Sequence, residues 1–282
     1  MSLEHSQDVH LESSDTGVDI LKIENAHAIA RMSLFGGHVL GFMPKHDEQE
    51  RLWLSDKAVL DGSKAIRGGI PICWPWFGDH PSQPELPAHG YVRNQNWQLL
   101  SIDEADEQTT LRLAPHTTLN EGFDGQAELE LEVRVGRSLT VTLTTTNIGD
   151  NPLSYGAALH SYLAAEDVTQ CVIEGLSGDY KDKLDSGRIK PTPHPYRISG
   201  EMDRVHLTMP ERVRLQSPAH PMQLLQSGHD SIVVWNPWSN KSQQMSDMPD
   251  NGYQCFVCIE AAVTQGYTLA PKQSHQLQQQ IT

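Results

Sequence analysis

The chain has 282 residues, of which 38% are hydrophobic and 20% charged, the balance of a globular protein and not of a disordered one. Its 36 acidic and 21 basic residues give a net charge of −15, and a surface this negative repels phosphate backbones, which argues against nucleic acid as a partner. No stretch reaches the roughly 20 apolar residues of a membrane span, and the polar, acidic start does not resemble a signal peptide. We therefore expect a cytoplasmic protein without membrane contact.

Alternation of apolar and polar residues predicts strands along much of the chain. Residues 97–102 and 109–113 form a first predicted pair. Residues 128–135 alternate strictly, and after a short turn residues 138–146 alternate leucine and valine with threonine, which predicts a hairpin. The side chains of its first strand that we expect to face inward are Leu129, Leu131, Val133 and Val135.

Residues 231–235 and 254–261 are further predicted strands, and the glutamine-rich residues 273–280 are expected to form a last strand that frays into solvent. We find no stretch of 12 residues with the apolar stripe of an amphipathic helix. The pattern therefore predicts an all-β protein: a large antiparallel β-sandwich in one domain over residues 1–282, with residues 1–15 as a flexible tail.

Two long segments, Arg67 to Arg93 and Gly175 to Arg204, are expected to be irregular, and loops of this length are usually functional or disordered. The first is rich in glycine and aromatic residues and also contains His89. Aromatic rings stack on sugar C–H faces, and the planar guanidinium groups of Arg67 and Arg93 can hold a phosphate through paired hydrogen bonds. This segment is therefore a candidate binding loop for a phosphorylated sugar.

His160 and Glu260 each stand alone as an ionisable residue within an apolar, strand-like segment. Burial of an unpaired histidine or glutamate is costly, so each needs a partner or a chemical task. Facing one cavity, the two would form a general acid–base pair.

Three further residues are candidate substrate ligands. Asp203 lies in a charged segment that we expect to be an exposed turn, and Asn236 and Trp238 belong to a Trp-Asn-Pro-Trp segment that ends a predicted strand. Taken singly, each candidate also has an ordinary interpretation: a satisfied core histidine, a surface arginine, a surface ion pair or a core tryptophan.

The four cysteines are too few for a disulfide framework. Cys255 and Cys258 have zinc-like spacing but no second pair of ligands in sequence, so we interpret the cysteines as small core residues and expect neither a metal nor a cofactor.

Taken in order, these segments resemble the hexose-6-phosphate mutarotase (glucose-6-phosphate 1-epimerase) family within the aldose 1-epimerase, or galactose mutarotase-like, superfamily. The resemblance covers residues from about 20 to about 270. The matching segments are Arg67-Gly68-Gly69-Ile70-Pro71, His89-Gly90 with Arg93-Asn94, Leu159-His160-Ser161-Tyr162, Gly175-Leu176 with Tyr180-Lys181-Asp182, Gly200-Glu201 with Asp203-Arg204, Trp235-Asn236-Pro237-Trp238, and Cys258-Ile259-Glu260.

The resemblance implies a galactose mutarotase-like sandwich with its site on a concave sheet face, and an isomerase acting on a hexose 6-phosphate, most plausibly glucose 6-phosphate. It implies that His160 is the catalytic acid and Glu260 the base, so we expect the imidazole and the carboxylate to converge across a gap about one pyranose ring wide. It places His89 near the anomeric carbon, Asp203 on sugar hydroxyls, and Arg67 with Arg93 around the phosphate. Ala88 departs from the family, in which a glutamine before the His-Gly pair can serve the phosphate.

Two alternatives stay open beside this interpretation. A non-catalytic carbohydrate-binding or sensing protein on the same fold would not need both His160 and Glu260. In a free-hexose mutarotase, Arg67 and Arg93 would have only structural roles. In each case we expect a small sugar as the partner and a monomeric chain.

Overall fold

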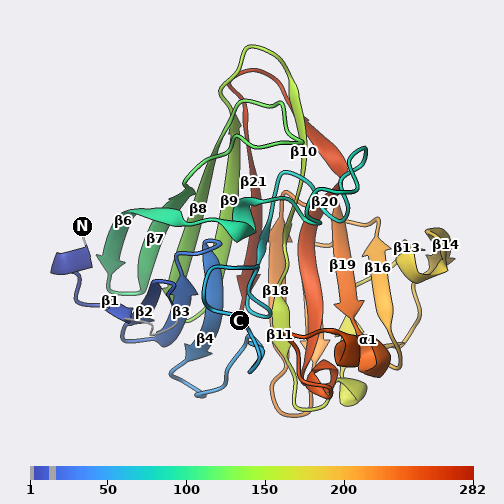
Figure 1. Ribbon diagram of the computed structural model, residues 1–282. Coiled ribbons are helices and arrows are strands. Elements are labelled where there is room, and N and C mark those ends of the chain that lie inside the picture. The colour runs from blue at the N-terminus through green and yellow to red at the C-terminus, as the bar shows by residue number, and fades with distance from the viewer. Residues whose placement is uncertain (1–2, 13–16) are drawn as a thin grey trace.

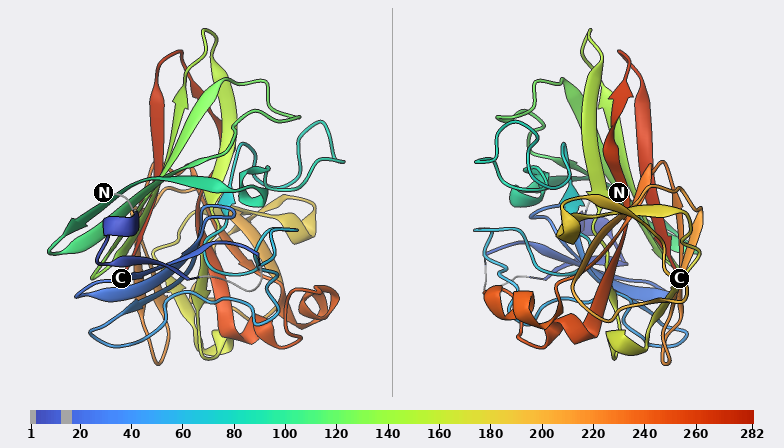
Figure 2. Two further views of the ribbon diagram at one scale, coloured as in Figure 1. Left: turned by 60° about the vertical axis from the view of Figure 1, so that its left-hand side comes forward. Right: turned by 90° about the vertical axis from the view of Figure 1, so that its right-hand side faces the viewer.

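The computed structural model describes residues 3–12 and 17–282, which form three antiparallel sheets (Figure 1). The N-terminal sheet has four strands in sequence order: β1 (Val9–Glu12), β2 (Ile20–Glu24), β3 (Ala28–Ser33) and β4 (His38–Pro44). In the left view of Figure 2 these strands and helix α1 (Trp238–Gln244) lie on opposite sides of the molecule.

The second sheet has eight strands. Seven of them follow one another in the spatial order β14 (Arg188–Pro191), β13 (Asp179–Asp182), β16 (Met202–His206), β19 (Ser231–Asn236), β20 (Phe256–Leu269), β10 (Leu153–Leu159) and β5 (Ile72–Cys73). The eighth, β11 (Tyr162–Ala164), also pairs with β20.

The third sheet has nine strands in the spatial order β15 (Tyr196–Arg197), β12 (Val172–Glu174), β17 (Arg212–Gln216), β18 (Met222–Ser227), β21 (Ser274–Ile281), β9 (Leu139–Asn147), β8 (Ala127–Gly136), β7 (Gln108–Pro115) and β6 (Trp97–Ala105). The remaining elements are the 3-10 turns η1 (Leu3–His5), η2 (Val92–Asn94), η3 (Val168–Gln170), η4 (Lys183–Asp185) and η5 (Gly252–Cys255).

Among the described residues no helix has the length and apolar character needed to cross a bilayer.

The main hydrophobic core gathers the inner faces of the two large sheets. The β8 side chains at positions 129, 131, 133 and 135 are buried there, as their alternation predicts, with exposures of 3% or less. On the other side, β20 contributes Ile259, Ala261 and Val263. The predicted β-sandwich and both predicted strand pairs, β6 with β7 and β8 with β9, are confirmed.

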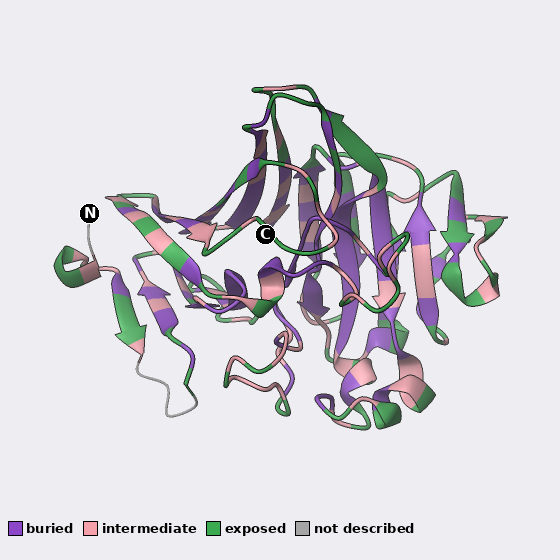
Figure 3. Cartoon of the chain, turned by 45° about the horizontal axis from the view of Figure 1, so that its top comes forward, coloured by how far each residue is buried: buried purple, intermediate pink, exposed green. Residues whose placement is uncertain are grey.

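The segment from Gly175 to Arg204 differs from its prediction because it is not irregular. It contains β13, β14, β15 and the start of β16, which extend the eight- and nine-stranded sheets. The expected exposed turn around Asp203 is part of β16, which pairs with both β13 and β19. Figure 3 shows the central strands of this sheet mostly buried, whereas the edge strand β14 is mostly exposed.

Both chain ends are also more ordered than predicted. Of the expected flexible tail, residues 1–2 and 13–15 lie outside the described residues, but Val9–Glu12 form β1, paired with β2, and Val9 is buried. The glutamine-rich end forms β21, which lies between β18 and β9 in the middle of its sheet. Leu277 and Ile281 enter the core, so this strand does not fray.

Candidate active site

Strand β20 places Glu260 on the face of its sheet that points away from the sandwich core. Because side chains alternate along a strand, Cys258, Glu260 and Ala262 share one face, whereas Ile259 and Ala261 point into the core. Glu260 lies opposite Val233 of β19 in the strand register.

His160 reaches the same face from a break between two strands. Leu159 at the end of β10 pairs with Ala261, and Tyr162 at the start of β11 pairs with Cys258. The residues between these two pairs therefore lie opposite Glu260 and its neighbour. The backbone N–H of His160 donates to the Pro71 carbonyl at 3.1 Å, which ties the break to the glycine-rich loop.

The imidazole and the carboxylate meet directly. His160 Nδ1 lies 3.3 Å from Glu260 Oε1, so the two groups are in contact and not separated by the pyranose-sized gap that the sequence suggests. This arrangement still suits ring opening, because the two oxygens that exchange protons in a hemiacetal are bonded to the same carbon. His160 is 7% exposed and Glu260 1% exposed. Within the described part of the chain, neither His160 Nδ1 nor either Glu260 oxygen has a hydrogen-bond partner.

Aromatic rings fix the plane of the His160 ring. Tyr162 stacks on it with ring centroids 4.9 Å apart and an interplanar angle of 9°, and Trp235 meets it edge-on. The ring of His89 lies 5.7 Å away. The Nδ1 atom is buried against Glu260, which leaves Nε2 as the ring nitrogen for a ligand.

The glycines of the Arg67–Arg93 loop bring the loop backbone close to other backbone and not to an open cavity. A Cβ on Gly90 would lie 1.9 Å from the Trp74 carbonyl oxygen, and one on Gly69 would lie 2.2 Å from that of Val39. Both glycines have positive φ. Glycine is therefore required at these two positions for chain packing, and this packing holds the neighbouring Arg67 and His89 in place.

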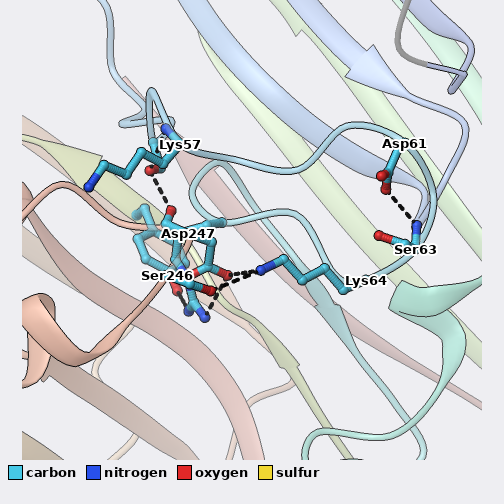
Figure 4. A network of polar contacts seen from close by, with 9 residues as sticks. Lys57, Asp61, Ser63, Lys64, Ser246 and Asp247 are labelled. Carbon is cyan, nitrogen blue, oxygen red and sulfur yellow. Dashed lines mark hydrogen bonds and ion pairs between the residues drawn. The ribbon is translucent and has the colours of Figure 1, made fainter.

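Arg67 is partly engaged by the protein itself. Its Nη1 donates to the Tyr162 hydroxyl at 2.8 Å, and its Nε and Nη2 donate to Asp247 at 3.3 and 3.4 Å. Lys64 also forms an ion pair with Asp247 at 3.6 Å, and Figure 4 shows the Lys64 side chain reaching that carboxylate. Arg67 is thus held firmly, with part of its donor capacity left for a ligand.

Arg93 and His89 lie at the other end of the loop. Arg93 Nη2 donates to the Ala88 carbonyl at 2.7 Å, so the backbone at the position that departs from the family helps to orient this guanidinium. His89 Nδ1 accepts from the Gly78 N–H at 3.3 Å, and its ring packs edge-on against Phe77.

Asp203 on β16 faces the same cavity, but its partner is not Arg204. Lys183 of η4 forms an ion pair with Asp203 at 3.5 Å. The guanidinium of Arg204 instead lies over the Tyr180 and Tyr196 rings, at 4.8 and 5.4 Å from their centroids. Asp203 is therefore positioned as a hydrogen-bond acceptor next to a cation.

These groups surround one cavity of about 230 Å³. Its lining residues are Arg67, Phe77, His89, Arg93, His160, Lys183, Asp203, Val233, Trp235, Lys241 and Glu260. A larger groove of about 590 Å³ lies over strands β7 to β9, but its lining includes no buried acid–base pair. The smaller cavity is the candidate active site because it joins an acid–base pair to polar ligands for a sugar.

The structure brings six of the eight predicted site residues to this cavity, and Asn236 and Trp238 are not among its lining residues. Asn236 is fully buried, and its amide donates to the Tyr253 and Phe256 carbonyls while accepting from the Trp238 N–H. This arrangement fits a structural role at the start of α1. Trp238 packs against Tyr253.

Sequence reasoning missed two cations of the cavity. Lys183 directly follows Tyr180-Lys181-Asp182, one of the segments that resemble the family, and this position could have indicated a site residue. It lies, however, in a stretch that was expected to be an irregular loop. Lys241 lies on α1 and forms an ion pair with Glu201 at 3.4 Å, and no local pattern distinguishes it from a surface lysine.

Burial and charge shift the ionisable groups of the site. Burial, followed by the charge of Asp203, raises the pKa of Glu260 well above its ordinary value. Burial lowers the pKa of His160 well below its ordinary value, and His89, Arg93 and Arg67 add to this effect. Burial, with Arg93 next, lowers the pKa of His89 to about 3, so this ring is neutral at pH 7. Clustered shifts of this kind are typical of functional sites.

Comparison with known proteins identifies the family of this chain. The family model described as aldose 1-epimerase matches residues 19–282. A curated protein of Salmonella typhimurium named "Putative glucose-6-phosphate 1-epimerase" is 31% identical over 263 residues, which are 91% of this chain and 86% of that protein.

Two solved structures are also similar. The crystal structure of a "putative mutarotase" from Salmonella typhimurium has a TM-score of 0.90 at 27% identity, covering 98% of this chain and 94% of that chain. A galactose mutarotase-like protein from Lactobacillus casei has a TM-score of 0.72 at 16% identity, covering 93% of this chain and 99% of that chain, a likeness that concerns the fold alone.

Proposed function

This chain belongs to the aldose 1-epimerase family, and from that premise we propose that it interconverts the α and β anomers of a hexose 6-phosphate, with glucose 6-phosphate as the foremost candidate. An enzyme of this family is an isomerase acting at the anomeric carbon. The proposal adds the phosphorylated substrate and the residues that carry the reaction.

The observation that carries the proposal is the charge of the cavity. Four cations line it, Arg67, Arg93, Lys183 and Lys241, against the two carboxyl groups of Asp203 and Glu260. The chain as a whole carries a net charge of −15, so this cavity is a local exception to the overall charge. A cavity lined by clustered cations attracts an anionic substrate that the rest of the surface repels.

Ring opening needs one group that takes the proton of the anomeric hydroxyl and one that protonates the ring oxygen. We assign the first task to the Glu260 carboxylate and the second to the His160 imidazolium. The C1–C2 bond then rotates in the open aldehyde, and the two groups exchange roles as the ring closes.

Phosphate binding would favour one part of the protonation state that this chemistry needs, the imidazolium. In the free site burial favours a neutral pair, with the proton on Glu260, although a glutamate in water is ionised at pH 7. Arg93 and Arg67 add to the low pKa of His160. A bound phosphate offsets these two positive charges and so favours the imidazolium form of His160, although it also weakens the lowering of the Glu260 pKa by Arg93.

A substrate comparison tests the proposal. We expect the wild-type enzyme to have a much higher kcat/KM for glucose 6-phosphate than for glucose, measured by polarimetry or by NMR saturation transfer. Arg93→Ala and Lys241→Ala should each raise KM for glucose 6-phosphate about 10-fold or more, because each removes a charge-assisted contact worth roughly 1.5–3 kcal/mol.

The matched control is Lys272→Ala, which removes an exposed lysine outside the cavity. This variant should behave like the wild type with both sugars. Equal kcat/KM for the two sugars in the wild type would identify a free-hexose mutarotase and overturn the phosphate assignment. No turnover of either sugar by the folded protein would favour the carbohydrate-binding alternative.

A further inference from the structure

The buried acid–base pair has a third neighbour that the reaction does not use. Cys258 lies two residues before Glu260 on β20 and faces the same side of the sheet. One ligand atom from each of His160, Cys258 and Glu260 can be chosen so that all three atoms lie within 4.8 Å of one another. All three residues are buried.

This cluster has unused binding capacity. His160 Nδ1 and both Glu260 oxygens lack hydrogen-bond partners among residues 3–12 and 17–282, and the two residues are 93% and 99% buried. A buried polar atom without a partner costs about 1–3 kcal/mol. The two side chains also border the cavity, so a ligand arriving through it reaches them without any opening of the sheets.

We propose that His160, Cys258 and Glu260 form a binding site for Zn²⁺, and that zinc bound there inhibits the enzyme. An imidazole, a thiolate and a carboxylate form a ligand set suited to zinc, with bond lengths of about 2.0–2.3 Å. His160 and Glu260 already lie 3.3 Å apart, close to the spacing of two ligands on one zinc ion. The fourth position faces the cavity, where water completes a tetrahedron.

The proposed site differs from the Cys255–Cys258 pair, whose spacing in the sequence resembles a zinc motif. Cys255 belongs to η5 and is only half-buried, and it is not a member of the cluster. The two additional ligands come instead from Glu260, two residues along β20, and from His160, about 100 residues away in the sequence.

The ligand atoms determine which cations can bind. On zinc binding the Cys258 thiol loses its proton to solvent, as does Glu260 where it holds the proton of the buried pair, and thiolate and carboxylate together balance the two positive charges of the ion. The four nearby side-chain cations repel any divalent metal, and a hard cation such as Mg²⁺ gains too little from a thiolate to offset this repulsion. The site should therefore select thiophilic metals.

Inhibition rests on the function proposed above, because zinc would occupy the two groups that transfer protons. The binding claim is independent of that function. Cobalt(II) added to the metal-free protein tests it directly, since a thiolate–cobalt bond gives a charge-transfer band in the near ultraviolet. We expect this band at one cobalt per chain in the wild type and its loss in Cys258→Ala.

Cys73→Ala is the matched control, because Cys73 is an equally buried free cysteine on the same sheet but outside the cluster. It should keep the cobalt band. Zinc should raise the Tm of the wild type and of Cys73→Ala but not of Cys258→Ala, provided that circular dichroism shows each variant to be folded.

Activity supplies the second arm of the test. We expect equimolar zinc to reduce wild-type turnover at least 10-fold and Cys258→Ala to be at least 10-fold less sensitive, with Mg²⁺ inactive on both. Absence of the band, or a band that survives Cys258→Ala, would overturn the zinc site. A band that requires Cys258 but leaves turnover unchanged would support the site and overturn the roles assigned to His160 and Glu260.

Discussion

Gln279 and Glu260, buried polar side chains of the two large sheets, differ in whether the protein satisfies their hydrogen-bonding groups. In the nine-stranded sheet, Gln279 is 2% exposed and accepts a hydrogen bond from the Ser161 hydroxyl at 2.5 Å while donating to the Ile259 carbonyl at 3.0 Å. In the eight-stranded sheet, Glu260 is buried to the same degree, yet neither carboxylate oxygen has a hydrogen-bond partner among the residues that the structure describes. Partners indicate a structural role for the glutamine, and their absence leaves the glutamate available to a ligand.

The contrast predicts that a substitution in the cavity changes kcat, whereas a substitution in the core changes the free energy of unfolding. Glu260→Gln should lower kcat by about 10²–10⁴-fold, because it removes a positioned proton acceptor. The urea midpoint should stay the same or rise, because the variant no longer buries an ionisable group. Polarimetry and urea denaturation of the same preparation check both parts, and near-normal turnover would reject the catalytic role of Glu260.

A substitution in the core of the nine-stranded sheet should have the opposite effect, a loss of stability without a loss of activity. Leu131→Ala truncates a fully buried side chain of β8 and should lower the free energy of unfolding by about 2–5 kcal/mol. Its kcat and KM should match the wild type at temperatures where the variant is folded. A large loss of kcat in the folded variant would contradict the expectation that this core position affects stability alone.

The smallest expected effect concerns a buried histidine outside both large sheets. His38 on β4 donates from Nε2 to the Gly68 carbonyl at 2.7 Å, and burial lowers its pKa to about 4 from an ordinary value of 6.5. Because the unfolded chain binds this proton more readily, its stabilising contribution is complete above about pH 6.5 and is lost as the pH falls toward 4.

This histidine should account for a loss of stability on the order of 1–2 kcal/mol between pH 7 and pH 5. His38→Gln keeps a donor for Gly68 but does not titrate, so urea unfolding should depend less on pH in this range than in the wild type. An unchanged pH dependence would show that His38 is not the group responsible.

How well the sequence predicts this fold depends on what each strand touches. Residues 128–135 pack one face on the core and the other toward solvent, so their alternation predicts the strand correctly. Strand β16, Met202–His206, has a polar cavity on one side and carries a mixed sequence, so its segment resembles a charged turn. In β21, Gln276 and Gln278 donate to Thr144 and Thr142 of β9, and such cross-strand pairs stabilise a strand without apolar alternation.

By itself the sequence determined the all-β architecture, through period-two patterning, and the two ionisable residues that stand out within apolar strands. Only the tertiary structure decided that His160 and Glu260 are in contact and that Lys183 and Lys241 line the same cavity. It also decided that the Asn236 amide donates to backbone carbonyls and not to a ligand. The physical reason is that alternation fixes which face a side chain occupies, whereas the pairing of strands some hundred residues apart depends on how all the apolar faces are buried together.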